Sequence, residues 1–323
     1  MGNLANNLEG RIAVITGAGR GLGREHALLF AKEGAKVVVN DLGGGTGGEG
    51  ADATPAQQVV DEIKGLGGEA VANYDNCADF AGAKNMINAA VETFGDLHVL
   101  VNNAGILRDR IIFNMTEEEW DAVINVHLKG HFAPAHHAAG YWRAQSKAGK
   151  EVKANIINTT SVAGLFFNPG QANYAAAKAG IASFTIVLAK ELGRYGVRVN
   201  CIGPYARTRL TLQTPGLDQM VKAPDDPDAF DIWDPANVSP LVAYLATEDC
   251  PWNGTVFHTF AGQVGIFHGW TLGETVEQGH RFSVDELKGA LQPLAAQYEG
   301  KLGSAALDEG IMGQAIMKAT SAT

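Results

Sequence analysis

Short apolar segments alternate with longer amphipathic segments along most of the chain, and this alternation limits the possible folds more than any other feature. The apolar segments are rich in β-branched residues, which is typical of strands covered on both faces. The longer segments repeat their apolar residues with a period of about 3.6, which is typical of helices. The order predicts βαβ units with right-handed crossovers, and so a single α/β domain with a doubly wound, parallel seven-stranded sheet. The predicted strands cover residues 11–16, 35–41, 69–75, 97–105, 153–161, 197–203 and 254–262.

Two segments depart from this alternation. "GGGTGGEGADATP" (43–55) is a glycine-rich insertion after the second predicted strand, and we predict a mobile surface loop there. Beyond the last strand, "SVDELKGALQPLAAQYEG" predicts one helix. We find no internal repeat and no second core, so we expect one domain over 8–262 and a partly helical C-terminal extension over 263–323. Within the domain, Thr116 and Glu119 in "TEEEW" predict a capping box that starts a long helix.

The composition narrows the class of partner and the compartment. Of 323 residues, 46% are hydrophobic and 19% are charged, which is enough for one large core. The net charge of −10 disfavours nucleic acid or an anionic membrane surface, because both bind clustered basic side chains. Cys77, Cys201 and Cys250 are far apart and predict buried thiols in a reducing compartment. Without a signal peptide or an apolar run of transmembrane length, we expect a cytoplasmic protein that acts on a small molecule.

A glycine-rich turn follows the first predicted strand in "TGAGRGLG" (16–23). Such a turn either allows close packing of a helix on a strand or lets the backbone approach the pyrophosphate of a dinucleotide. The next strand ends in Asp41, at the spacing of a carboxylate that binds the ribose hydroxyls of a dinucleotide. The sequence therefore predicts a Rossmann-type cofactor site. Its residues are Gly17, Gly19, Arg20, Gly21, Leu22, Gly23 and Asp41.

The stretch "SVAGLFFNPGQANYAAAK" brings Ser161, Tyr174 and Lys178 into one short segment. If its second half is helical, Tyr174 and Lys178 lie on one face, one turn apart. A tyrosine hydroxyl has a pKa of about 10 in water, so it is a poor base at neutral pH. A neighbouring ammonium group, aided by the positive nicotinamide ring of an oxidised dinucleotide, favours the phenolate and lowers that pKa. We predict that Tyr174 exchanges a proton with an alcohol substrate while Ser161 holds the substrate oxygen.

These motifs together resemble the short-chain dehydrogenase/reductase family, from the "TGxxxGxG" spacing to about residue 262. The resemblance implies that "NNAG" borders the cofactor, that Asp75 and Asn76 contact its adenine, and that "GPYA" (203–206) lines the nicotinamide. The family more often has proline before glycine in this last segment. The resemblance also implies that Lys178 binds the nicotinamide ribose and that Asn125 holds the water of a proton relay. The cofactor contacts implied in this way are Asp75, Asn76, Asn103, Ala104, Gly105, Tyr174, Lys178, Gly203, Pro204, Tyr205 and Ala206.

Two residues give conflicting indications of the cofactor. Asp41 would repel the 2′-phosphate of NADP, whereas Arg20 is of a type that binds this phosphate in some members of the family. A carboxylate at the position of the phosphate carries a Coulomb and desolvation cost that one flexible arginine need not offset. We therefore expect NAD as the cofactor, with NADP less favoured.

A finer resemblance points to the substrate. "VVVNDLGG", "NNAGILRDR", "EEWDAVINVHLKGHF" and "GQANYAAAKAG" resemble the (3R)-hydroxyacyl-CoA dehydrogenase region of peroxisomal multifunctional β-oxidation enzymes and actinobacterial relatives of steroid or steroid side-chain catabolism. This implies NAD-dependent oxidation of a (3R)-hydroxyacyl-CoA to the 3-oxoacyl-CoA. A hydroxysteroid substrate is the first alternative, and a 3-oxoacyl-carrier-protein reductase is the second. A non-catalytic NAD-binding scaffold is a further alternative, because a fold alone does not prove chemistry.

The segment after Gly203 can serve the substrate or merely cover the domain. Its two arginines, Arg207 and Arg209, can meet CoA phosphates or lie in solvent. Trp142, Phe166 and Phe167 either line the substrate pocket or belong to the core. The apolar residues of the segment are Leu210, Leu212, Leu217, Met220, Val221, Phe230 and Trp233. The family pairs through two long helices, here 116–145 and 172–195, which implies a homodimer or a homotetramer.

Four histidines follow one another on the predicted long helix: His127, His131, His136 and His137. No carboxylate or cysteine accompanies them at the spacing of metal ligands, so we predict no metal site. We expect these histidines at a helix surface or a subunit contact.

Overall fold

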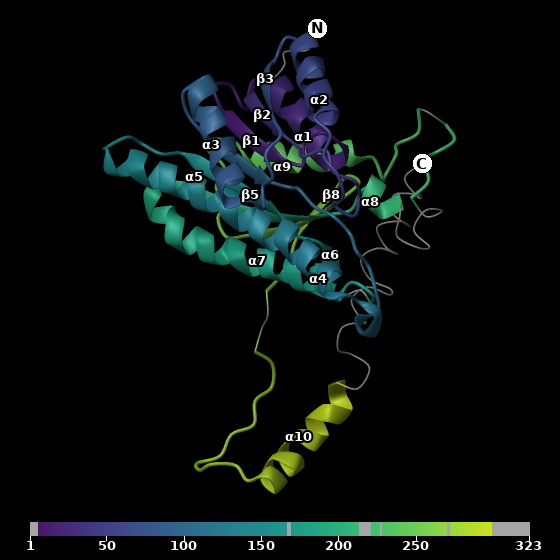
Figure 1. The fold of residues 1–323 in the computed structure, drawn as a ribbon. Coiled ribbons are helices and arrows are strands. Elements are labelled where there is room, and N and C mark those ends of the chain that lie inside the picture. Colours follow the sequence, from purple (N-terminus) through teal and green to yellow (C-terminus); the bar gives the residue numbers. More distant parts are fainter. Residues whose placement is uncertain (1–5, 167–168, 213–220, 227, 270–271, 299–323) are drawn as a thin grey trace. The chain divides into compact units, whose positions relative to one another are not determined.

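The computed structural model describes residues 6–166, 169–212, 221–226, 228–269 and 272–298. The chain divides into two compact units between Ile266 and Phe267. The described part of the first unit contains one eight-stranded sheet with the strand order β3-β2-β1-β4-β5-β6-β7-β8 (Figure 1). The strands are β1 (Ile12–Thr16), β2 (Lys36–Asn40), β3 (Glu69–Asn73), β4 (Val99–Asn102), β5 (Ala154–Thr159), β6 (Val197–Pro204), β7 (Val256–Phe260) and β8 (Gln263–Ile266).

The predicted parallel seven-stranded sheet is confirmed, and β8 adds an antiparallel eighth strand that the sequence does not predict. Ala261 takes a φ of 51°, and the two-residue turn that it begins pairs Phe260 with Gln263. Most side chains of β8 are exposed at this edge of the sheet, including Val264 and Ile266. A short edge strand of this kind has no apolar face to bury, so its sequence carries no periodic signal.

Helices cover both faces of the sheet, as Figure 1 shows, and the central strands β1, β4 and β5 are buried on both sides. One core lies under α1 (Gly21–Lys32), α2 (Thr54–Gly65) and α9 (Ser239–Leu245). The other lies under α3 (Phe80–Phe94), α5 (Gly130–Lys147) and α7 (Ala172–Leu192). Trp142 is part of this second core, where its indole Nε1 donates to the carbonyl of Leu97 at 2.7 Å. This placement assigns Trp142 to the core.

The predicted capping box is confirmed, but the long helix that it starts is interrupted. Thr116 Oγ1 accepts a hydrogen bond from the backbone of Glu119 at 3.2 Å, and the Glu119 carboxylate accepts one from the backbone of Thr116 at 3.1 Å. The helix begins as α4 (Glu117–Ile124), passes through one π-helical turn, η2 (Asn125–Lys129), and continues as α5. Single π-helical turns inside α-helices are frequent at functional sites. The other short helical segments are η1 (Ile112–Asn114), α6 (Val162–Phe166), η3 (Gly193–Tyr195), α8 (Arg209–Leu212) and η4 (Pro235–Val238).

The glycine-rich loop (residues 42–53) contains most of the insertion 43–55 for which the sequence predicts mobility, and that mobility stays a prediction. The backbone N–H of Gly45 donates to the carbonyl of Glu49 at 2.7 Å, which closes the loop on itself. Leu107 donates its backbone N–H to the carbonyl of Thr46 at 3.0 Å, and Arg108 Nε donates to the carbonyl of Gly47 at 2.8 Å. The loop is therefore bonded to the segment that follows β4.

The second unit contains α10 (Val284–Tyr298), at the position of the helix that the sequence predicts in the extension. The tail 299–323, Leu217, Met220, Phe167 and the side chain of Phe166 lie outside the described residues.

One helix in the described part of the chain is long and apolar enough to cross a membrane by length and composition alone. It is α7 with the turn after it (Ala172–Tyr195), with a mean hydropathy of 1.2. Because α7 packs on β6 and contributes Leu188, Ala189 and Leu192 to the second core, burial within the domain accounts for its apolar character.

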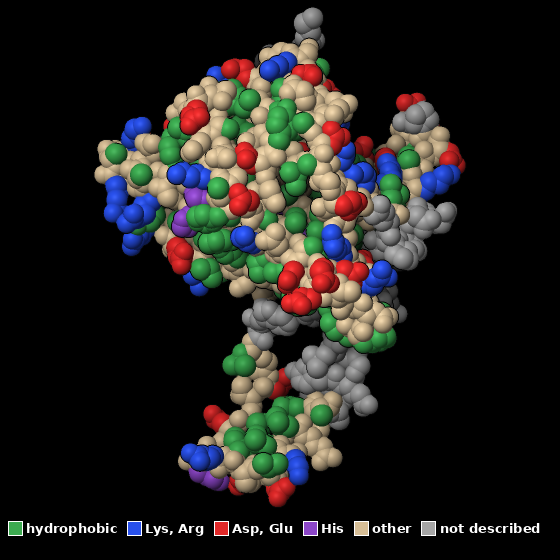
Figure 2. Space-filling model, viewed as in Figure 1, with side chains coloured by type: hydrophobic (Ala, Val, Ile, Leu, Met, Phe, Trp, Pro, Cys, Tyr) green, Lys and Arg blue, Asp and Glu red, His purple; other side chains and the backbone are tan. Residues whose placement is uncertain are grey.

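The surface and the cysteines agree with the composition. Cys77, Cys201 and Cys250 are buried free thiols, as predicted. Figure 2 shows acidic and basic side chains interspersed on the face in view. A group of acidic side chains lies over α4, whose first turn carries Glu117, Glu118 and Glu119.

We predict that Thr116→Ala lowers the free energy of unfolding by about 1 kcal/mol, because it leaves the N-terminal N–H groups of α4 without their side-chain acceptor. Denaturant unfolding followed by circular dichroism measures the change. Thr116→Ser keeps the hydroxyl and serves as the control, with a free energy close to that of the unmodified chain. An equal loss in both variants would contradict the capping role.

Candidate active site

The sheet order reverses between β1 and β4, and the carboxyl ends of these strands mark the crevice where such sheets bind ligands. Three glycines of the turn that follows β1 have no room for a side chain. A Cβ on Gly17 would lie 2.8 Å from the Cα of Ala104, and one on Gly23 would lie 2.2 Å from the carbonyl oxygen of Gly17. A Cβ on Gly19 would lie 2.8 Å from the Asp41 carboxylate. At these three glycines the turn exposes only its backbone, as the binding of a phosphate group requires.

The turn is fixed by the strand beside it and leads to an open helix end. Asn103 donates its side-chain amide to the carbonyl of Thr16 at 3.1 Å and to that of Gly17 at 3.2 Å. The backbone N–H of Ala104 donates to Thr16 Oγ1 at 3.1 Å. No side chain caps the N-terminus of α1, where Arg20 is the N-cap residue in the described structure. The uncapped N–H groups at the N-terminus of α1 suit the pyrophosphate of a dinucleotide.

Asp41 lies beside this turn, directly after β2. Its two carboxylate oxygens accept backbone hydrogen bonds from Gly19 at 2.8 Å and from Gly43 at 2.6 Å. An ionised carboxylate has further acceptor positions, so these bonds hold Asp41 in place and leave capacity for ribose hydroxyls. Asp75 and Asn76 follow β3, and Asp75 accepts a bond from the Asn73 side chain at 2.7 Å. Their contact with adenine stays a prediction.

The end of β6 faces the glycine turn from the other side. Gly203 and Pro204 pair with β7, so their reversed order keeps an ordinary extended strand. Tyr205 continues this path by donating its backbone N–H to the carbonyl of Thr259 at 3.0 Å, and Ala206 is buried behind it. Thr208 then lies 3.6 Å from where a Cβ of Gly21 would be. The structure therefore brings the two predicted cofactor-lining segments together.

Ser161, Tyr174 and Lys178 also come together, at the carboxyl end of β5 and the start of α7. A hydrogen bond with Ser161 acts on the Tyr174 hydroxyl. Lys178 is only 2% exposed; its Nζ lies 5.4 Å from the centre of the Tyr174 ring and donates to the carbonyl of Thr159 at 2.7 Å. The helical face predicted for Tyr174 and Lys178 is thus present, next to the serine.

The electrostatics of this cluster differ from the sequence-based expectation. Burial raises the pKa of Tyr174 to about 12, while the hydrogen bond with Ser161 lowers it and the charge of Asp109 raises it further. Burial lowers the pKa of Lys178 to about 7. Desolvation outweighs the attraction between phenolate and ammonium here, because both groups lose water. In the chain without ligand, Tyr174 is therefore a neutral phenol, ready to donate a proton.

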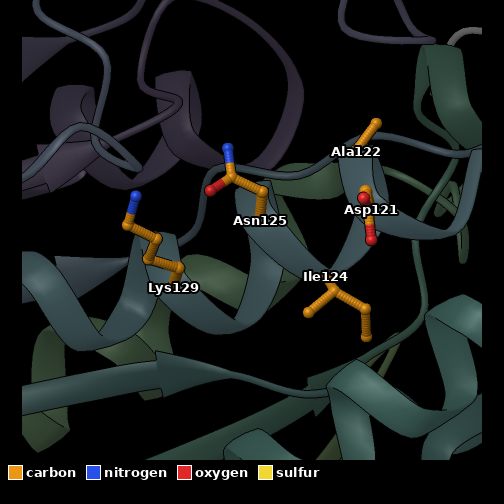
Figure 3. A pocket seen from close by; sticks show the side chains of 5 residues that line it. All are labelled: Asp121, Ala122, Ile124, Asn125 and Lys129. Atoms are coloured by element: carbon orange, nitrogen blue, oxygen red, sulfur yellow. The ribbon is translucent and has the colours of Figure 1, made fainter. Parts of the chain in front are cut away.

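Asn125 is not brought to this cluster. Its side chain is exposed at the start of η2 and lines a shallow surface pocket with Asp121, Ala122, Ile124 and Lys129. Figure 3 shows Asn125 and Lys129 pointing to the same side of the helix. In the part of the chain that is described, no hydrogen bond joins the Asn125 side chain to Ser161, Tyr174 or Lys178. Its placement does not support the predicted relay role.

His127, two residues further on, is a residue of this turn that does contact Tyr174. It is 1% exposed, and its ring meets the Tyr174 ring edge-on with 5.0 Å between the centres. Its Nε2 bonds to the backbone of Ile106, 3.1 Å from the nitrogen and 2.8 Å from the oxygen. A Cβ on Gly105 would lie 2.5 Å from the ring, so this glycine makes space for it.

The expectation that the four histidines lie at a helix surface is wrong for His127 and His131, which are both buried. Burial lowers the pKa of both, and that of His131 falls to about 3, so both rings are neutral. His136 and His137 do lie at the surface, against the ring of Phe80. The extra residue of the π-helical turn changes which side chains face inward after Asn125. A regular period of 3.6 cannot show this.

A second residue near Tyr174, Asp109, lies within the quoted motif "NNAGILRDR", but the sequence assigns it no role. Asp109 follows the "NNAG" segment, and its Oδ2 accepts a hydrogen bond from the Gln171 side chain at 2.7 Å. Its other oxygen is buried without a hydrogen-bond partner, and burial raises the pKa of the carboxyl group. An acidic residue next to a loop carries no periodic signal, so only the fold reveals it.

The two arginines after Gly203 have different surroundings. Arg207 forms a two-pronged ion pair with Asp231 and donates to the carbonyl of Val221 at 3.0 Å. Arg207 therefore fastens the segment after β6. The pKa of Arg209 is lowered by partial burial and by Arg20, and it is raised by Asp41 and Glu49. Arg209 thus lies among the charges around the cofactor turn.

The described residues contain no group of three or more His, Cys, Asp or Glu side chains arranged to hold a metal ion.

Comparison with known proteins places the chain among dehydrogenases. Residues 11–214 match the family model described as short chain dehydrogenase. The chain is 45% identical over 286 residues to "Hydroxyacyl-CoA dehydrogenase ChsB1" of Mycobacterium tuberculosis, covering 86% of this chain and 84% of that protein. It is also 45% identical over 260 residues to "Peroxisomal multifunctional enzyme type 2" of Drosophila melanogaster, covering 80% of this chain but only 40% of that longer protein. The resemblances stated from the sequence are confirmed.

Two solved structures share the fold. A short chain dehydrogenase from Mycobacterium avium is 51% identical, with a TM-score of 0.78, and covers 91% of this chain and 96% of its own. A short chain dehydrogenase from Burkholderia cenocepacia in complex with NADP is 28% identical, with a TM-score of 0.67, and covers 79% of this chain and 98% of its own.

The buried ammonium of Lys178 gives a pH dependence of stability whose sign is fixed. Its pKa falls from 10.5 to about 7 on folding, so between these pH values the unfolded chain binds more protons. We predict that Lys178 makes the free energy of unfolding rise with pH from about 7 to 10.5, and that Lys178→Met removes this contribution. Urea unfolding at several pH values measures the difference between the two proteins. Lys190→Met, on the exposed face of α7, is the control; an equal effect there would contradict the assignment.

Proposed function

We propose that this chain, which belongs to the short chain dehydrogenase family, oxidises a (3R)-3-hydroxyacyl-CoA to the 3-oxoacyl-CoA with NAD. Like its relatives, it is an oxidoreductase acting on CH–OH donors. The observation that carries the reaction is the contact of Tyr174 with Ser161 beside buried Lys178. The observation that carries the substrate is the similarity to a hydroxyacyl-CoA dehydrogenase over most of both chains.

In the proposed mechanism Ser161 and Tyr174 both hydrogen-bond the substrate hydroxyl. Tyr174 takes the hydroxyl proton as the carbinol carbon loses its hydride, and in reduction it gives the proton back. Lys178, anchored on Thr159, keeps an ammonium group next to the phenol. When bound, the oxidised dinucleotide accepts the hydride and adds a positive charge beside Tyr174. Together these positive charges oppose the effect of burial on the phenol and favour its ionised form.

Cofactor contacts are proposed for the bare turn Gly17–Gly23, for the backbone of Asn103, Ala104 and Gly105, and for the end of β6. The family uses NAD or NADP, and we propose NAD because Asp41 is fixed beside the turn by two backbone N–H groups. A 2′-phosphate next to this carboxylate would meet direct repulsion.

We further propose that His127, and not Asn125, supports the reacting tyrosine. The ring of His127 is held by Ile106 on one side and presses its edge against Tyr174 on the other. Aromatic edge-to-face contacts stabilise a fixed ring orientation. His127 is therefore a positioning residue that keeps the Tyr174 hydroxyl directed at Ser161.

A hydroxysteroid is the second candidate substrate. The short helix η1 carries two exposed apolar residues, Ile112 and Phe113, the latter 82% exposed. They are close in sequence to Asp109, whose charge raises the pKa of Tyr174. Such an apolar surface suits a steroid as well as an acyl chain. Carrier-protein reduction is less favoured because we propose NAD, and a scaffold is less favoured because Ser161, Tyr174 and Lys178 are assembled.

For assembly and compartment we propose a homodimer or homotetramer in the cytoplasm. Phe132 of α5 and Val187 of α7 are exposed apolar side chains on the two helices expected to pair. The three buried free thiols suit a reducing compartment.

We predict NADH formation when the purified protein is given NAD and a (3R)-3-hydroxyacyl-CoA, and much slower formation with a 3-hydroxysteroid. Absorbance at the NADH band measures both rates. Tyr174→Phe should lower kcat by at least about 100-fold while dinucleotide binding persists, because it removes only the proton-exchanging hydroxyl. Near-normal turnover in this variant would exclude Tyr174 as the acid/base, and NADH with neither substrate would favour a scaffold.

A second pair of variants separates His127 from Asn125. We predict that His127→Ala lowers kcat by about tenfold or more with little change in KM for NAD, and that His127→Phe restores most of the loss through the same ring contact. Asn125→Ala is measured beside them at the same pH. A larger loss in Asn125→Ala than in His127→Ala would restore the original relay prediction.

A further inference from the structure

The glycine-rich loop (residues 42–53) connects the two ends of the candidate site. At one end it begins directly after Asp41, whose carboxylate accepts the N–H of Gly43. At the other end it is bonded through Thr46 and Gly47 to Leu107 and Arg108, next to the segment that holds His127. Gly43 has a φ of +76°, and a Cβ there would lie 1.8 Å from the carbonyl oxygen of Asp52, so the two ends of the loop meet closely.

This loop carries one carboxylate, that of Asp52, to the arginine of the cofactor turn. Arg20, the N-cap residue of α1, has an Nη atom 4.0 Å from Asp52 Oδ2 and another 3.5 Å from the carbonyl oxygen of Gly44. The loop therefore supplies both contacts that the structure gives to the Arg20 guanidinium. Glu49 folds back over the loop, with its carboxylate 1.8 Å from where a Cβ of Gly45 would be.

A second arginine, Arg209, lies in the segment after β6 that faces the glycine turn. Arg209 directly follows Thr208, which lies 3.6 Å from the Cβ position of Gly21 and so covers the same turn. The charges that act on Arg209 are those of Arg20, Asp41 and Glu49. Two arginines and three carboxylates, two of them from the loop, thus lie around the cofactor turn.

We propose that the glycine-rich loop selects NAD over NADP by pairing Asp52 with Arg20 and by adding the negative charge of Glu49 on the same loop, so that Arg20 is not free to bind the 2′-phosphate of NADP. This inference rests on the proposed use of NAD. A phosphate monoester carries a charge of about −2 at neutral pH and binds best to free guanidinium groups. With the loop in place, Arg20 is already paired with Asp52, and the negative charges of Glu49 and Asp52 repel the phosphate. Selectivity then comes from three carboxylates, and Asp41 is only one of them.

The test measures the dissociation constants of NAD and NADP by titration calorimetry without any substrate. Glu49→Gln/Asp52→Asn keeps the size of both side chains, and the remaining oxygen of residue 52 can still accept the N–H of Thr54, as Asp52 Oδ1 does at 2.9 Å. We expect NADP to bind more tightly relative to NAD by about tenfold, the scale of two partly exposed charge pairs. Glu69→Gln is the control, because it also removes one carboxylate charge. Glu69 pairs with Lys36 at the amino-terminal ends of β3 and β2, away from the cofactor turn, so the ratio of the NAD and NADP dissociation constants should not change.

A double-mutant cycle identifies the cation. Arg20→Ala should remove most of the gained NADP affinity in the Glu49→Gln/Asp52→Asn background, and should change NADP affinity little in the unmodified chain. A ratio within twofold of the unmodified protein overturns the inference, as does an equal gain for NAD and NADP. If the double variant unfolds at a lower temperature, Glu49→Gln alone decides, because its side chain is exposed. Failure of the proposed function appears separately, as absence of NADH formation with either substrate in the unmodified protein.

Discussion

The buried ammonium group of Lys178 is the interaction on which the reacting end depends. An amine removed from water is costly unless a polar partner receives it, and the carbonyl of Thr159 at the end of β5 does so at 2.7 Å. This bond ties α7 to the central sheet just where Ser161 begins the next loop. Tyr174, one turn earlier on α7, is thereby held beside the serine. The sheet, and not the loop, determines where the phenol lies.

The fold could be predicted from the sequence because buried parallel strands and their covering helices leave strong periodic patterns. The glycine turn, Asp41 and the Ser161–Tyr174–Lys178 segment were equally accessible, since each depends on local spacing. What local patterns could not show is how distant segments meet. The edge strand β8 buries few side chains, and the π-helical turn at Asn125–Lys129 shifts the inward face by one residue. The prediction for Asn125 comes from its match to the family's motif, and a motif does not show which side chain of this turn contacts Tyr174.

The sequence also gave no account of solvent exclusion. Spacing predicts that Lys178, with the positive ring of a bound oxidised dinucleotide, lowers the pKa of Tyr174, because spacing shows only the attraction between opposite charges. In the structure both groups are desolvated, and burial raises the pKa of the phenol to about 12 while it lowers that of the amine to about 7. The balance between attraction and desolvation depends on the depth of each atom, and depth is a property of the assembled domain.

The π-helical turn has a consequence for how this helix can change during evolution. It holds one residue more than an α-helical turn, so loss of a single residue from Asn125–Lys129 would restore a regular helix and rotate everything after it by about 100°. Trp142 would then leave its seat beside Leu97. Insertions and deletions are therefore disfavoured in this short segment, whereas substitutions at its exposed positions are tolerated. Gaps in an alignment of relatives should lie outside it.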